Sequence, residues 1–226
     1  MGIEKIIKQK LDNLFTPKSK NETVQEIIKR GYVGSKVETN KILFVGINPS
    51  YVNGAKPESY FYKVSDAIKE YPKHYKNFNA LLLNTKYKGK WSYIDLFFFR
   101  ETDQDKIDLM IRNEIMFIVE QLRLTNEIIK SINPKVIIIA NSKSANFFGI
   151  NKIENKKGEL TNIWLGLNFE FDKNSGLMKV VGINDNSIIE QSDFTFYKDK
   201  LFLFTSTLTY MNKFEKERLS WLIDRL

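Results

Sequence analysis

Four short, almost uninterrupted apolar segments recur along the chain, at residues 41–47, 93–99, 136–140 and 201–204. In the stretches between them, apolar residues often repeat at the spacing of a helix. Strands that are apolar on both sides are typical of a parallel sheet whose two faces are covered by helices. The pattern therefore predicts an α/β protein: a three-layer α/β/α sandwich around a central, mostly parallel four-stranded sheet.

The clearest helix is predicted between the second and third strands. Its apolar positions are Ile107, Met110, Ile111, Ile115, Ile118, Val119 and Leu122, and Asn133-Pro134 marks its end. Further helices are expected at residues 3–15, 21–30, 64–70, 78–84 and 142–149, and at the C-terminal end of the chain. We expect Asn21 and Ser142 to cap two of them.

The 226 residues contain no internal repeat and no linker-like segment, so a single domain over 1–226 is expected. Residues 1–40 are interpreted as an N-terminal helical extension. Residues 151–200 are polar and rich in Asn, Asp and Gly, and we interpret them as a variable excursion. Its strand-like pieces, 162–171 and 178–183, are consistent with a hairpin.

The composition excludes several classes of chemistry. The chain has no cysteine, which rules out disulfides and cysteine-ligated metals. His74 is the only histidine, so a multi-histidine zinc site and most Ser-His-Asp mechanisms lack their parts. There is no Walker A motif and no glycine-rich dinucleotide fingerprint. We therefore expect neither a metal nor a cofactor.

Lys and Arg outnumber Asp and Glu by 35 to 27, a formal net charge of +8. Such a balance favours a polyanionic partner such as nucleic acid, although a lysine-rich proteome gives basic proteins without that role. No apolar run reaches the ~18 residues that span a bilayer, and the charged N-terminal segment lacks the core of a signal peptide. The expectation is a cytoplasmic monomer without membrane association.

Polar residues follow three of the four predicted strands: Asn48, Asp95, and Thr205 with Ser206. Parallel sheets bind ligands at the carboxyl ends of their strands, so a site is predicted there. The first of these strands runs into "GINPS". Gly46 permits a sharp turn, and Pro49 restricts the backbone after Asn48, whose amide can accept and donate. An ordinary Asn-Pro turn is the alternative interpretation.

"GINPS" after an apolar strand resembles the first motif of the uracil-DNA glycosylase superfamily, above all its mismatch-specific branch, where Gly-Ile-Asn-Pro-Gly follows a strand. The resemblance implies that Asn48 positions the water that attacks the sugar C1′. It places Gly46 and Ile47 against the base and Ser50, where that branch has glycine, against DNA. Asparagine cannot take up a proton at neutral pH. Catalysis would therefore depend on positioning and on stabilising an oxocarbenium-like cation.

Two further base-binding positions follow from the resemblance. An aromatic side chain after the first motif stacks on the flipped base in this superfamily, and Phe61 matches it. The second strand often ends in an asparagine that reads the uracil edge, where this chain has Asp95. A carboxylate suits the amino group of cytosine or adenine, whereas a protonated carboxyl could donate to O4 of uracil. His74 is assigned to the same pocket.

The last motif departs furthest from the superfamily, which mostly carries a His-Pro-Ser-like segment after the last strand. Here "LFLFTSTLTYMN" places Phe204 opposite the histidine and Ser206 opposite the serine. DNA contacts are expected from Ser206, Thr207, Leu208 and Tyr210, with Leu208, Tyr210 or Met211 as a wedge in the base stack. Lysines interleaved with aromatic residues over 51–90 also suit backbone contact and base stacking.

The sequence thus predicts a DNA glycosylase-like protein. It would hydrolyse the N-glycosidic bond of a damaged or deaminated base flipped out of DNA, either single-stranded or as a mismatched duplex. Two alternatives remain open. One is a non-catalytic nucleic-acid-binding relative with the same fold, and the other is a hydrolase or sensor of free nucleosides or nucleotides.

Overall fold

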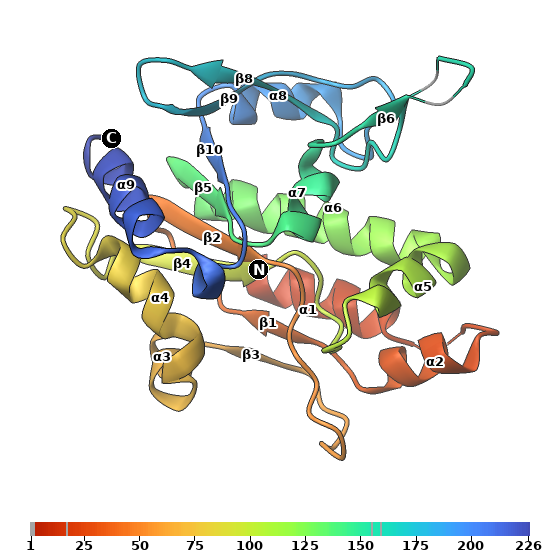
Figure 1. Ribbon diagram of the computed structural model, residues 1–226. Coiled ribbons are helices and arrows are strands. Elements are labelled where there is room, and N and C mark those ends of the chain that lie inside the picture. The colour runs from red at the N-terminus through yellow and green to blue at the C-terminus, as the bar shows by residue number, and fades with distance from the viewer. Residues whose placement is uncertain (1–2, 17, 155, 159) are drawn as a thin grey trace.

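A six-stranded mixed sheet forms the centre of the protein (Figure 1). The computed structural model describes residues 3–16, 18–154, 156–158 and 160–226. The strand order is β4 (Trp91–Asp95), β2 (Ile42–Gly46), β5 (Val136–Ile139), β10 (Leu201–Phe204), β9 (Leu177–Ile183) and β8 (Leu167–Asp172). The first four strands are parallel, and β9 is antiparallel to both of its neighbours, β10 and β8. The predicted α/β class with a mostly parallel sheet is confirmed, but the prediction of four strands is wrong.

The two additional strands come from the segment that was expected to be an excursion. β8 and β9 form an antiparallel hairpin, and β9 pairs with β10 through Leu201↔Lys179 and Phe202↔Met178. Phe169 of β8 lies 5.0 Å from Phe202, ring centroid to centroid. The hairpin therefore extends both the sheet and its core.

Helices pack against both faces of the sheet, because alternate residues of its strands point in opposite directions. Leu43 and Val45 of β2 belong to one buried cluster, and Ile42 and Phe44 to the other. The first cluster includes residues of α1 (Ile3–Leu14), α2 (Glu22–Lys29), α5 (Asp105–Asn113), α6 (Ile115–Ile132), α7 (Ser142–Phe148) and α8 (Phe194–Tyr197). The second includes residues of α3 (Val64–Glu70), α4 (Pro72–Leu82) and α9 (Lys213–Asp224) (Figure 1).

Several predicted boundaries differ from the observed ones. The long helix is broken at Glu114 (φ −143°, ψ 55°) into α5 and α6. The break leaves Ile115 exposed while Ile118 faces the core. The apolar repeat in the sequence continues across the break, which is why a single helix was predicted. The helix expected at 78–84 begins earlier, at Pro72, where proline is suited to the first turn. α7 is capped by Asn141 rather than Ser142, since the Asn141 side chain accepts from two backbone N–H groups.

The second parallel strand is also shorter than predicted, ending at Asp95 rather than at residue 99. Residues 96–99 are buried without being a strand. Leu96 N donates to Gly46 O, Phe97 N to Ile47 O, and Phe98 N to the Gln121 side chain. These bonds replace the missing ladder and hold the segment beside the end of β2.

Two small sheets complete the fold. β1 (Val33–Ser35) pairs in parallel with β3 (Tyr60–Tyr62), and β6 (Ile153–Glu154) pairs with β7 (Leu160–Thr161). Phe61 lies against Gly34 and Tyr32 in the first core cluster, whereas Tyr62 packs against the second. β3 therefore directs neighbouring aromatic side chains to opposite sides of the molecule.

The chain leaves β2 towards β4 on one side and leaves β5 towards β10 on the other. Such a reversal opens a crevice between the carboxyl ends of the two strands, the usual ligand position in open α/β sheets. Asn48 follows β2 and Asn141 follows β5, so both lie at this switch point. Among the described residues, the helices lack the combination of length and apolarity that crossing a membrane requires.

Candidate functional site at the carboxyl ends of β2 and β4

The candidate site is centred on the paired residues Gly46 and Asp95, the last of their strands. A Cβ on Gly46 would lie 2.3 Å from Asp95 Oδ1 and 2.2 Å from the Tyr93 hydroxyl oxygen. The absence of a side chain at Gly46 is therefore what lets these two polar groups lie over the end of β2. Asp95 Oδ1 accepts a hydrogen bond of 2.8 Å from the Tyr93 hydroxyl.

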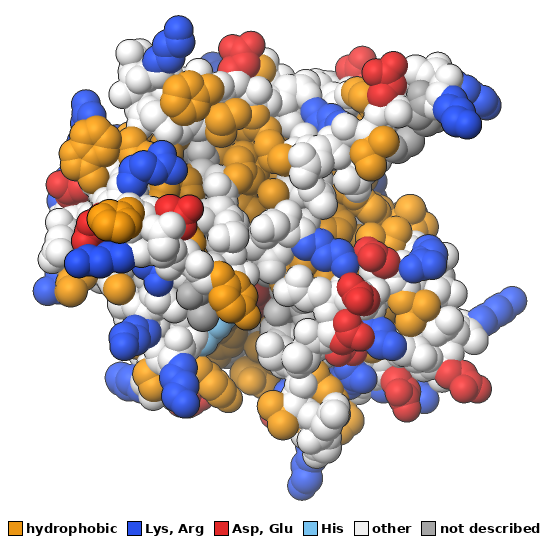
Figure 2. Space-filling model, in the orientation of Figure 1, with side chains coloured by type: hydrophobic (Ala, Val, Ile, Leu, Met, Phe, Trp, Pro, Cys, Tyr) orange, Lys and Arg blue, Asp and Glu red, His pale blue; other side chains and the backbone are white. Residues whose placement is uncertain are grey.

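Aromatic side chains surround this pair. The hydroxyl oxygens of Tyr62 and Tyr75 lie 3.0 Å apart, which joins β3 to α4. The His74 ring is 4.8 Å from the Tyr75 ring and 5.8 Å from the Tyr93 ring, centroid to centroid, both in edge-on contact. The surface is hollowed beside this single histidine (Figure 2). We call Tyr62, His74, Tyr75, Tyr93 and Asp95 the aromatic–acid cluster.

Burial sets the protonation of the aromatic–acid cluster. Desolvation raises the pKa of Asp95 to about 7, even though the hydrogen bond from Tyr93 acts in the opposite direction. The pKa values of Tyr62 and Tyr93 are raised by burial first and by the nearby Asp95 charge second, so both phenols stay protonated. Desolvation lowers the pKa of His74, an exposed residue, and so favours its neutral form. The cluster thus offers several donors and one carboxyl group that titrates near neutrality.

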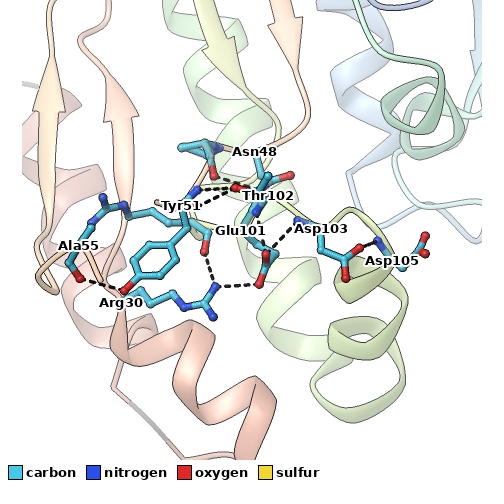
Figure 3. A network of polar contacts seen from close by, with 10 residues as sticks. Arg30, Asn48, Tyr51, Ala55, Glu101, Thr102, Asp103 and Asp105 are labelled. Atoms are coloured by element: carbon cyan, nitrogen blue, oxygen red, sulfur yellow. Dashed lines mark hydrogen bonds and ion pairs between the residues drawn. The ribbon is translucent and has the colours of Figure 1, made fainter. Parts of the chain in front are cut away.

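Asn48 is half-buried, and its amide is held by main-chain carbonyls (Figure 3). Nδ2 donates to Glu101 O at 2.5 Å and to Pro49 O at 3.1 Å. Two carbonyl acceptors fix which end of the amide faces them, because only the NH2 group can donate. Within the described part of the chain, Oδ1 has no hydrogen-bond partner. Asn48 can therefore accept from a bound water or ligand.

The loop that carries Asn48 is joined to the segment after β4 along its length (Figure 3). Glu101 N donates to Pro49 O, while Thr102 Oγ1 accepts from Tyr51 N and donates to Tyr51 O. The Glu101 carboxylate accepts from Arg30 at 2.7 Å and from the N–H groups of Thr102 and Asp103. Burial alone would raise the pKa of Glu101, but these hydrogen bonds lower it. The carboxylate thus stays ionised in a structural role.

Two arginines flank this loop near Tyr51. The guanidinium carbon of Arg30 lies 4.2 Å from the Tyr51 ring centroid, and that of Arg100 lies 5.4 Å from it. Arg100 is buried, and its Nε has no partner within the described residues. Both cations stabilise the loop by stacking, which the sequence pattern did not reveal.

The structure brings together only part of the predicted base-binding set. Gly46, Asp95 and His74 belong to one region, and Asn48 follows Gly46 by two residues. Ile47 is instead buried in the first core cluster. Phe61 packs on that same side, and Tyr62 takes the place near Asp95 that had been predicted for Phe61. Neighbouring residues of a strand point to opposite sides, but the strand Tyr60–Tyr62 was not predicted, so the sequence could not show which of Phe61 and Tyr62 faces Asp95.

The predicted DNA-contacting residues differ in accessibility. Ser50, Ser206 and Thr207 are exposed, and Tyr210 is 86% exposed. Leu208, in the short 3-10 helix η2 (Leu208–Tyr210), is instead buried in the second cluster. A buried leucine cannot enter a base stack without leaving the core. Of the three predicted wedges, Tyr210 is the most exposed, and Met211 is half-buried.

Residues after β5 complete the crevice and were not anticipated as part of it. Ser144 Oγ donates to Gly46 O at 3.1 Å, and Asn141 caps α7. Tyr93 was missed as well, although it precedes Asp95 by two and must share its face of the strand. In the described ranges, no group of three or more His, Asp or Glu side chains is placed to hold a metal ion.

The fold and the site together define an α/β protein with a polar, aromatic-lined site at the carboxyl ends of its central parallel strands. No protein-family model and no curated protein sequence matches the chain.

Proposed function

We propose that the protein is a base-releasing hydrolase of the uracil-DNA glycosylase type. It would bind a damaged or deaminated base flipped out of DNA and hydrolyse the N-glycosidic bond, as a step of DNA repair and without a cofactor. The proposal includes the three-layer α/β/α architecture and a cytoplasmic monomer. The observation that supports it best is the half-buried, desolvated Asp95 carboxyl, which lies among aromatic rings beside the Asn48 loop.

The aromatic–acid cluster suits a planar base. Aromatic rings can pack against the faces or edges of the base, and the Asp95 carboxyl can bind its hydrogen-bonding edge. In its ionised form Asp95 accepts from an exocyclic amino group, and in its protonated form it donates to a carbonyl. Because the pKa of Asp95 is about 7, both forms are present at neutral pH.

In this proposal, Asn48 positions the attacking water molecule. With its two amide hydrogens held by carbonyls, its Oδ1 can accept from a water molecule and orient it towards C1′. Asn48 does not deprotonate that water. The reaction would depend on departure of the base and on electrostatic stabilisation of the oxocarbenium-like sugar.

A non-catalytic nucleic-acid-binding relative is the second candidate. Asn48 ties two loops together whether or not a reaction takes place. At the position of the family's last-motif histidine, Phe204 lies 5.0 Å from the Phe169 ring, centroid to centroid, and so has a packing role. These two observations favour binding without turnover.

The test is a panel of single-stranded and duplex oligonucleotides that carry uracil, hypoxanthine, xanthine or alkylated adenine, scored for cleavage at abasic sites. Release of any of these bases supports the hydrolase. Oligonucleotide binding with a steep salt dependence but without base release supports the binding relative. Turnover of free nucleosides alone would instead indicate a nucleoside hydrolase.

A further inference from the structure

One face of α9 exposes two large aromatic side chains. Phe214 is 80% exposed and Trp221 is 56% exposed. Arg218 and Arg225 are exposed as well, and the guanidinium carbon of Arg225 lies 4.6 Å from the Trp221 ring centroid. Positions 214, 218, 221 and 225 follow the i, i+4, i+7, i+11 spacing and share one helix face. We call these four residues the α9 stripe.

The α9 stripe lies on a well-anchored helix. Leu219, Leu222 and Ile223 bury another face of α9 in the second core cluster. Asn212 and Glu215 form a capping box at its N-terminus, and Lys216 Nζ donates to Asn77 Oδ1 at 3.0 Å. The aromatic side chains are thus presented to solvent by a fixed scaffold.

The charges of α9 leave the stripe cationic. The three acidic residues of the helix are engaged elsewhere: Glu215 in the capping box, Glu217 with Lys213, and Asp224 with the backbone N–H of Lys86. In the part of the chain that the structure describes, neither Arg218 nor Arg225 forms an ion pair. Exposed rings and unpaired arginines in one line match the bases and phosphates of a single nucleic-acid strand. Figure 2 shows hydrophobic, basic and acidic side chains interspersed on this side of the molecule.

We propose that the α9 stripe binds single-stranded nucleic acid, with bases stacked on Phe214 and Trp221 and phosphates paired with Arg218 and Arg225. Seven residues of helix separate the two rings by about 10 Å along the axis, the length of about three stacked nucleotides. α4, which carries His74, packs against both η2 and α9. The stripe and the candidate site therefore lie on neighbouring elements. The inference rests on the proposed nucleic-acid partner but not on hydrolysis of a glycosidic bond.

The test is fluorescence anisotropy with a fluorescein-labelled 12-nucleotide oligo(dT), which offers no damaged base. The Phe214→Ala/Trp221→Ala variant should bind at least about tenfold more weakly than the unmodified protein. Phe171→Ala is the matched control, since Phe171 is 61% exposed on β8 and shares a face of that strand with Phe169, which packs against the first core cluster and not the cluster of α9. It should bind like the unmodified protein. Arg218→Gln/Arg225→Gln should make the salt dependence shallower by about 1.4 in log–log slope, at ~0.7 per contact.

Unchanged affinity in the aromatic variant, or equal loss in the Phe171→Ala control, would overturn the proposal. So would sedimentation showing that the unmodified protein dimerises through the stripe and that oligo(dT) does not compete. Asn48→Ala separates this proposal from the proposed function, because it should stop base release while oligo(dT) binding persists. If no base is ever released, the binding measurements still decide the role of the stripe.

Discussion

Asn48 Nδ2 donates to the main-chain oxygen of Glu101 across 2.5 Å, so a residue at the end of β2 is fastened to the segment that follows β4. The same amide group also bonds to Pro49 O. The side chain thereby has a fixed orientation, and Oδ1, which has no partner among the described residues, is left to bind a water or a ligand. The same amide group thus has a structural contact and, in the proposed function, the task of positioning water, and an experiment on Asn48 must separate the two.

Replacing Asn48 by alanine should abolish base release and also lower the free energy of unfolding by about 1–3 kcal/mol, because the Glu101 carbonyl loses its donor. Oligonucleotide affinity should change little. Cleavage at abasic sites, urea unfolding and anisotropy measure the three effects. The control is Thr102→Val, which removes another side-chain link between the two loops, at Tyr51, while keeping Asn48. If Thr102→Val stops base release as completely as Asn48→Ala, loop order rather than water positioning would explain the loss.

Asp95→Asn should change which base is released. The asparagine amide always offers a donor, so the release of bases with a carbonyl at the recognised edge, such as uracil, should increase relative to that of alkylated adenine. In the unmodified protein, the preference should move from carbonyl-edged towards amino-bearing bases as the pH rises through about 7, because the pKa of Asp95 is about 7. Competition assays at pH 6 and pH 8.5 measure both effects. If the two proteins show the same base preference at pH 6 and at pH 8.5, Asp95 does not recognise the base.

The stability of the protein should also report on Asp95. Its pKa is raised from 3.8 to about 7 on folding, so between these values the folded state holds more protons than the unfolded state. Stability must then fall as the pH rises through this window, by at most about 4 kcal/mol. Asp95→Asn should remove that part of the slope. Urea unfolding at intervals from pH 4 to pH 8 measures it, and parallel curves for the two proteins would contradict the raised pKa.

Gly46→Ala should displace the Tyr93 hydroxyl and the Asp95 carboxyl, since the added methyl group would lie within 2.3 Å of both oxygens. We expect a loss of about 1–3 kcal/mol in stability together with a large loss of base binding. Gly182→Ala, whose added Cβ would lie 3.5 Å from the nearest side-chain atom, is the matched control in another strand of the same sheet. Equal behaviour of the two variants would mean that Gly46 is not specifically needed for the site.

The elements that could be predicted are those with strong local signals. The four parallel strands carry continuous apolar runs, and Asn48 and Asp95 follow or end two of them. The carboxyl-end rule placed both residues on the same edge of the sheet before their contacts were known. The N-cap at Asn21 was also correct, and its side chain accepts from Val24 N as a cap should.

The features that could not be predicted depend on where side chains point and on contacts between distant segments, rather than on residue type. Phe61 and Tyr62 are both aromatic, and only the pairing of β3 with β1 decides that Tyr62 rather than Phe61 lies near Asp95. The break at Glu114 leaves the apolar spacing nearly intact, so periodicity alone could not reveal it. The Arg30 and Arg100 contacts with Tyr51 join distant parts of the sequence and leave no local pattern.

The β8–β9 hairpin also determines which strand forms the open border of the sheet. Without it, β10 would present the unpaired backbone of "LFLF" along one side, a template for aggregation with other chains. With the hairpin in place, the border strand is β8, whose "LNFEFD" carries Glu170 and Asp172. Negative charge on a border strand discourages edge-to-edge pairing between molecules. Residues 167–183 thus cover a strand edge that would otherwise be open to other chains, although they lie apart from the aromatic–acid cluster.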